Sequence, residues 1–157
     1  ADPAAPAITF AREQTIGFWI RRMAHETLIR RIDAEQAHSY RSAIDAELAL
    51  DGIAEMFDVF ITRRSDIDEF VPSDTVVKVA SGGRIWTARL GRRIDRSRAG
   101  DTKVPMAIVA EVATPDATFS GDPEEVLLWI WGRAPLAGIA VDGPVDVAHR
   151  FRQVCSI

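Results

Sequence analysis

Cysteine is almost absent from this 157-residue sequence, which contains Cys155 alone. One cysteine excludes a disulfide framework within the chain and a zinc site built from a cysteine cluster. No histidine lies at a spacing from Cys155 that suggests an activated thiol, so we interpret this residue as incidental. A reducing, cytoplasmic compartment fits a chain so poor in cysteine.

Long apolar runs are also missing. No stretch approaches the roughly 18 apolar residues of a membrane span, so we expect no membrane partner. The first residues, ADPAAPAITF, lack the basic start and apolar core of a signal peptide, and they lack an initiator methionine. Either that methionine was removed or the sequence is part of a longer protein.

Positive charge is outweighed by negative charge, because 19 lysines and arginines stand against 23 acidic residues and leave a net charge of −4. An acidic balance argues against a nucleic-acid-binding surface. The composition, 47% hydrophobic and 27% charged, is that of a globular protein, and the chain is long enough to bury a core.

The first part of the chain has helical periodicity. Apolar residues recur at steps of three and four between Thr15 and Ala37, and again between Asp45 and Thr62, which predicts two helices. Gly52 weakens the second helix by about 1 kcal/mol relative to alanine. Residues 1–11 are rich in alanine and proline, and we expect them to be extended.

β-type segments follow. Two of them flank the Gly82-Gly83 dipeptide, which predicts a hairpin. The predicted strands are Thr75–Ser81, Arg84–Leu90, Val104–Val112 and Asp116–Gly121. The predicted loops are Ser65–Asp74, which Pro72 closes, and the charged segment Gly91–Lys103.

A helix with well-marked ends comes next. Asp122 is a suitable N-cap, Pro123 suits the first turn, and Glu125 completes a capping box. Gly132 is a natural stop. The remaining predicted elements are a strand over Leu136–Gly143 and a helix over Pro144–Val154. We therefore predict an α+β fold, with a helical segment at residues 1–64 and an α/β domain at residues 65–157.

Four passages, in this order, resemble the mycothiol-dependent maleylpyruvate isomerase family. They are WIRRMAHETLIRRIDAE (19–35), ELALDGIAEMF (47–57), DATFSGDPEEVLLWIWGR (116–133) and IAVDGPVDVAHRFR (139–152). The resemblance implies a DinB-like four-helix bundle followed by an α/β domain similar to sterol carrier proteins. It also implies a thiol-dependent isomerase or transferase that uses mycothiol and a divalent metal, usually zinc, bound in the bundle.

The family's metal-binding pattern resembles H-E-x-x-x-H-R-x-D-A in the last bundle helix. Glu26 falls on its glutamate ligand, Arg30 falls where the second histidine is expected, and Asp33 falls on its aspartate. A further histidine, from an early helix, has no counterpart, because so few residues precede the pattern. The sequence therefore resembles a family member without most of the N-terminal bundle and without two of the three metal ligands.

Glu26 and Arg30 allow two interpretations. They form an i,i+4 ion pair, which Arg22 can join and which stabilises an exposed helix by about 0.3–0.5 kcal/mol. Alternatively they are a degenerate metal site in which Arg30, which has no lone pair for a metal, holds an anion instead.

His25 points about 100° away from Glu26 around the helix, so we expect it to pack at a helix or domain contact. For His38 and His149 we expect surface or capping roles.

Arg133 falls on the arginine of the family's L-x-L-W-x-W-G-R pattern. By resemblance it helps to bind substrate or thiol, which makes it the candidate catalytic residue. The structural alternative is an arginine that bonds the last carbonyls of a helix. Trp129 and Trp131 are expected in the core.

Two functions remain open: a mycothiol-dependent isomerase or thiol transferase, and a non-catalytic module that binds a small ligand or a protein. The first helix carries apolar residues on more than one face. We therefore expect a homo-oligomer, or a separate chain that supplies the missing helices. The apolar residues of this helix are Phe18, Trp19, Met23, Leu28, Ile29 and Ile32.

Overall fold

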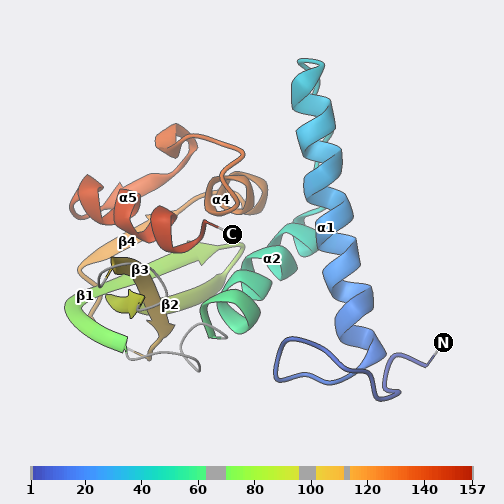
Figure 1. Ribbon diagram of the computed structural model, residues 1–157. Coiled ribbons are helices and arrows are strands. Elements are labelled where there is room, and N and C mark those ends of the chain that lie inside the picture. The colour runs from blue at the N-terminus through green and yellow to red at the C-terminus, as the bar shows by residue number, and fades with distance from the viewer. Residues whose placement is uncertain (1, 63–69, 96–101, 112–113, 157) are drawn as a thin grey trace.

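The structure, a computed structural model, describes residues 2–62, 70–95, 102–111 and 114–156. Its helices are α1 (Ile16–Ala37), α2 (Ala46–Glu55), the π-helical η1 (Met56–Ile61), α4 (Pro123–Ile130), the short 3-10 helix η2 (Leu136–Gly138) and α5 (Val145–Val154). Its strands are β1 (Phe70–Ser81), β2 (Arg84–Asp95), β3 (Thr102–Val109), β4 (Ala117–Ser120) and β5 (Ala140–Asp142) (Figure 1). The predicted α+β class is confirmed, whereas the DinB-like bundle stays a prediction.

The five strands form one sheet in the order β3-β2-β1-β4-β5. β1 and β2 pair antiparallel, and β4 lies parallel to β1 on its other side. Gly82 and Gly83 join β1 to β2 with φ angles of 53° and 76°, a conformation that glycine adopts without strain. The predicted hairpin is therefore confirmed.

Several predicted strand ends are wrong. β1 begins at Phe70 and so includes Pro72, which we expected in a loop; the pairing register shifts between Pro72 and Val76, and such a bulge tolerates the missing N–H of proline. β2 continues to Asp95 and pairs with β3, which begins at Thr102. This pairing satisfies backbone N–H and C=O groups of both strands. β3 ends at Val109, before the predicted end at Val112, because Ala110 and Glu111 are not in a strand. The remainder of both predicted loops and the expected domain boundary at Ser65 lie outside the described residues.

The predicted starts of the first two helices are confirmed, but the helix predicted over Asp45–Thr62 is α-helical only as far as Glu55 and continues as the π-helical η1. The Thr15 hydroxyl accepts a hydrogen bond from the Phe18 N–H at 3.1 Å, and the Asp45 carboxylate accepts one from the Leu48 N–H at 3.0 Å. These are N-cap bonds, which satisfy donors that the first turn leaves free.

The capping box predicted for α4 is wrong. Asp122 occupies the N-cap position but makes no side-chain cap bond. Glu124 and Glu125 instead accept hydrogen bonds from the Arg41 guanidinium, each at 2.6 Å, and these carboxylates raise the pKa of Arg41. A charged donor competes better for Glu125 than a neutral backbone N–H does. The strand predicted over Leu136–Gly143 is likewise shorter, because η2 occupies its first residues.

The core lies between one face of the sheet and the helices. Alternate strand residues are buried there, among them Val77, Val79, Ala88, Leu90, Ala117 and Phe119. Phe151 of α5 is central, with ring centroids 6.0 Å from Phe57, 5.8 Å from Phe119 and 5.9 Å from Trp129. The aromatic rings thus join η1, α4 and α5 to the sheet.

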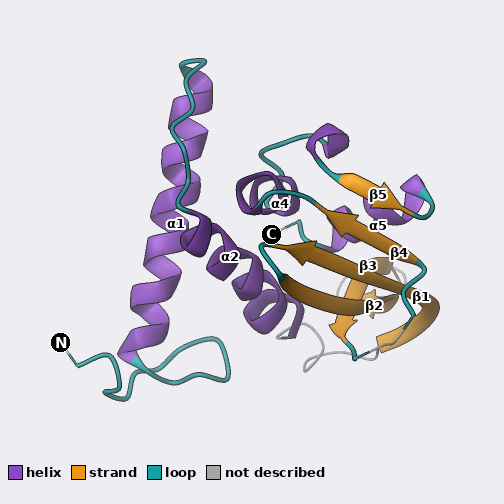
Figure 2. Cartoon of the chain, turned by 180° about the vertical axis from the view of Figure 1, so that it is seen from behind, coloured by secondary structure: helices purple, strands orange, loops and turns teal. Residues whose placement is uncertain are grey.

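Helix α1 stands apart from the sheet, on the far side of α2 (Figures 1 and 2). One side of it is buried, but Trp19, Ile20 and Met23 are 37%, 54% and 49% exposed. The Trp19 indole donates to the Ile8 carbonyl at 2.9 Å, so the N-terminal segment covers part of this surface. That a second copy or another chain covers the rest stays a prediction.

Within the described residues, no helix is both long and apolar enough to cross a membrane.

Candidate functional site

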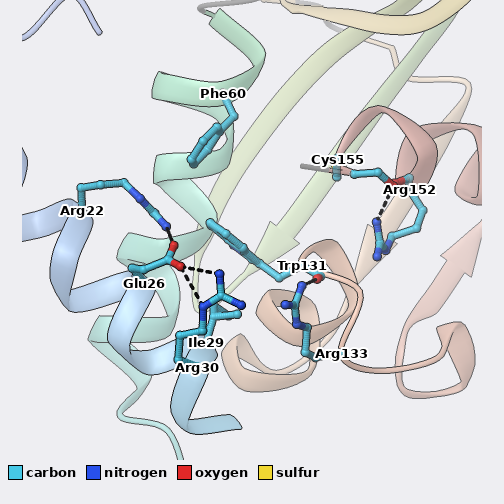
Figure 3. A pocket seen from close by; sticks show the side chains of 10 residues that line it. Arg22, Glu26, Ile29, Arg30, Phe60, Trp131, Arg133, Arg152 and Cys155 are labelled. Atoms are coloured by element: carbon cyan, nitrogen blue, oxygen red, sulfur yellow. Dashed lines mark hydrogen bonds and ion pairs between the residues drawn. The ribbon is translucent and has the colours of Figure 1, made fainter. Parts of the chain in front are cut away.

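A cavity of about 420 Å³ lies where α1 meets the C-terminal ends of α4 and α5. Four arginines and one glutamate line it, together with Ile29, Phe60, Trp131, Cys155 and Ser156. Figure 3 shows Arg30 and Glu26 on the α1 side, with Arg133 and Arg152 on the side of α4 and α5. Two of the sequence candidates, Glu26 and Arg133, are therefore brought to one cavity although they are far apart in the chain.

Arg133 follows directly after α4, at a helix end of the Schellman type. Gly132 has φ 75°, its N–H donates to the Trp129 carbonyl at 3.0 Å, and the Arg133 N–H donates to the Leu128 carbonyl at 2.7 Å. The predicted stop at Gly132 is thus explained by backbone geometry. The turn directs the Arg133 side chain away from the sheet and towards α1.

The Arg133 guanidinium is bound to α1. Its Nε and Nη2 donate to the two carboxylate oxygens of Asp33 at 2.8 and 3.0 Å, and its Nη1 donates to the Trp131 carbonyl at 2.6 Å. The hydrogen bond from Arg133 lowers the pKa of Asp33, and Asp33 in turn raises the pKa of Arg133. Asp33 and Arg133, one from each family pattern, therefore form an ion pair that joins α1 to the end of α4.

Asp33→Asn is expected to lower the free energy of unfolding by about 1 kcal/mol at neutral pH, since both side chains are about one-third exposed. Because the pKa of Asp33 lies below its usual 3.8, this stabilisation is complete above about pH 4 and is lost as the pH falls through the lowered pKa. Urea titrations from pH 7 to pH 3 measure it. Asp146→Asn, whose carboxylate is 72% exposed, is the control and should change little; equal losses in both variants would contradict the prediction.

Glu26 lies between two arginines of its own helix. Its carboxylate accepts hydrogen bonds from Arg22 at 2.5 Å and from Arg30 at 3.0 Å, and these neighbours lower its pKa. The expected i,i+4 ion pair with Arg30 is present. Arg30 is 71% exposed, so this pair contributes little to stability.

The residues around Glu26 do not fit zinc. Zinc in an enzyme takes about three protein ligands with lone pairs, whereas the nearest side chains here are arginines, which offer none. Over the ranges that the structure describes, no group of three or more histidine, cysteine, aspartate or glutamate side chains can hold a metal ion.

A buried charged cluster lies behind the cavity, between α1 and α2. Arg22, His25 and Glu55 are 6%, 2% and 1% exposed, and Arg22 Nη1 donates to Glu55 Oε2. The His25 ring nitrogens lie 2.9 Å from Glu55 Oε2 and 3.1 Å from Asp51 Oδ2, although neither contact has hydrogen-bond alignment. The Arg22 guanidinium also lies 5.3 Å from the ring centroids of Phe60 and Trp131.

Sequence reasoning missed Arg22 and Glu55 as part of this cluster, although one signal was available. Residues 18, 22, 25, 29 and 32 follow helical spacing, and all five are buried, so Arg22 and His25 interrupt an otherwise apolar stripe. A charge inside such a stripe calls for a buried partner. His25 packs at the helix contact that we expected.

The other expected residues lie as follows. His38 is the C-cap of α1, and His149 is exposed on α5. Trp129 and Trp131 are 3% and 7% exposed, in the core as predicted. Cys155 is buried in the wall of the cavity.

Arg152 is a cavity residue that the sequence did not single out. Burial lowers the pKa of its guanidinium; the interaction with Cys155 opposes this shift, and the nearby charge of Arg133 adds to it. A Cβ at position 132 would lie 1.6 Å from Arg152 Nη2, so glycine there leaves the space that this side chain occupies. No local sequence pattern identifies such a contact.

Comparison with known proteins gives one family. The sequence model described as the MDMPI C-terminal domain matches residues 47–150. Among solved structures, the chain is similar to the crystal structure of sterol carrier protein 2 like 2 from Aedes aegypti, with 18% sequence identity. The match covers 85% of this chain and 97% of that chain. The TM-score of this comparison is 0.26. No curated protein matches the chain.

Proposed function

Since this chain belongs to the MDMPI C-terminal domain family, the C-terminal domain of mycothiol-dependent maleylpyruvate isomerases, we propose that its cavity binds a small carboxylate ligand of the maleylpyruvate class. The observation that carries the proposal is a cavity wall with four arginines, of which three are paired with Glu55, Glu26 and Asp33, while Arg152 has no carboxylate partner among the described residues. Guanidinium groups match carboxylates in charge and in planar, two-point geometry. The proposed role of this chain is binding without catalysis.

The catalytic alternative is a mycothiol-dependent isomerase or thiol transferase, as the family implies. One observation favours it: positive charge near a bound thiol stabilises the thiolate, which is the reactive form. In that alternative, mycothiol is the thiol cofactor and enters the same cavity. The cavity residues offer no zinc site to lower the thiol pKa further, which is why we place binding first.

Maleate, a small dicarboxylate that does not react, tests the proposal. We expect saturable binding that changes tryptophan fluorescence, because Trp131 lines the cavity. We also expect the affinity to fall as salt is added, since salt screens charged contacts. The uncharged maleamide is the control ligand and should not bind. Equal binding of maleate and maleamide, or no saturable binding of maleate, would contradict a carboxylate site.

A further inference from the structure

The charges around the cavity are matched for three of its four arginines. Arg22 is paired with Glu55, Arg30 with Glu26, and Arg133 with Asp33. Among the residues that the structure describes, Arg152 has no carboxylate partner; its Nη1 donates to the Ser156 hydroxyl at 3.2 Å. Within the described part of the chain, the charge of one cavity arginine is therefore not matched by a carboxylate.

Arg152 is held in place by the fold. It lies in the last turn of α5, and its guanidinium lies over Gly132, whose missing Cβ makes room for it. The same glycine is required for the end of α4, with φ 75°. A single position thus forms the turn that presents Arg133 and the space that admits Arg152.

Arg152 and Arg133 differ in the charge and the N–H donors that are available to bind an anion. The charge of Arg133 is neutralised by Asp33 in a two-point contact, and a third bond goes to the Trp131 carbonyl. Arg152 has five N–H donors, and towards the described residues one of them is used, in a bond to a neutral hydroxyl. A half-buried cation is stabilised by an anion that binds beside it, here from the cavity.

We propose that Arg152, rather than Arg133, contacts the carboxylate of the ligand in this cavity. Arg133 is then a positioning residue, which fixes α1 against the end of α4 and shapes the cavity wall. The ligand class is a small molecule with at least one carboxylate, bound with that group towards α5. This inference rests on the proposed function.

The test compares maleate affinity and melting temperature in four proteins: wild type, Arg152→Gln, Arg150→Gln and Arg133→Gln. Arg152→Gln should weaken maleate binding roughly ten- to hundredfold at an unchanged melting temperature, as expected for the loss of a charged hydrogen bond. Arg150→Gln removes the same charge from the same helix outside this cavity, and should bind maleate within about twofold of wild type. Arg133→Gln should lower the melting temperature and weaken binding less than Arg152→Gln does.

Gly132→Ala gives a second readout. Its methyl group displaces the Arg152 guanidinium without removing its charge, and it also strains the turn that presents Arg133, so affinity and melting temperature should both fall. Wild-type affinity in this variant would contradict the assignment of Arg152. If wild type binds maleate and Arg152→Gln binds it equally well, the assignment of Arg152 is wrong and the proposed function stands. If wild type does not bind maleate, the proposed function itself fails. Loss of binding in Arg133→Gln alone, at an unchanged melting temperature, would transfer the carboxylate contact to Arg133.

Discussion

Glu55→Ala is expected to lower the free energy of unfolding by about 3–5 kcal/mol, the usual cost of leaving a buried charge without its partner. Glu55 is 1% exposed, and its carboxylate contacts both Arg22 and His25. Its removal leaves a buried guanidinium with Glu26 as its remaining carboxylate contact among the described residues. Such a loss is a large part of a typical stability of about 5–15 kcal/mol.

Two variants serve as controls in the same urea titrations. Glu55→Gln keeps the size and one acceptor but not the charge, and should fall between wild type and Glu55→Ala. Glu47→Ala removes a glutamate of the same helix that pairs with Arg84 on the surface, where the side chains are 75% and 45% exposed. That pair contributes at most about 1 kcal/mol. A loss in Glu55→Ala no larger than that in Glu47→Ala would show that the buried cluster does not stabilise the junction of α1 and α2.

This chain alone is expected not to isomerise maleylpyruvate with mycothiol, with or without added zinc. The thiol must be deprotonated to attack the substrate, and a free thiol has a pKa of about 8.5. Metal coordination is the means by which the family is expected to lower that pKa. Here Arg30 stands at the expected ligand position, and Glu26 is already bound by two arginines.

The absorbance of substrate and product measures this directly. We expect turnover far below the usual range of about 1–10³ s⁻¹. Arg30→His adds one nitrogen donor but no complete ligand set among the described residues, so it should not rescue the reaction. Turnover within the usual range by the unmodified chain would establish the catalytic alternative and would require a thiol-activating group other than the one that the family pattern implies.

Arg152→Gln is expected to lower the affinity for maleate without changing the melting temperature. Glu55→Ala and Asp33→Asn are expected to lower the free energy of unfolding, because they remove contacts that hold α1.

Local patterns in the sequence were sufficient for the types of most elements. The helix from Thr15 to Ala37, the Gly82-Gly83 hairpin and the helix end at Gly132 each follow from residues close together in the chain. Capping, turn conformation and helical periodicity are local properties, so a single sequence contains them.

Only the tertiary structure decided which charged groups meet. Asp33 and Arg133 are separated by 100 residues, and Glu125 bonds Arg41 rather than its own helix end because another segment brings a guanidinium to it. The partner of a charge depends on how helices and strands pack, and no periodicity specifies that. For the same reason the sequence indicated Arg133 as the candidate, while the folded chain placed Arg152, supplied by a different helix, at the cavity wall with its charge unmatched among the described residues.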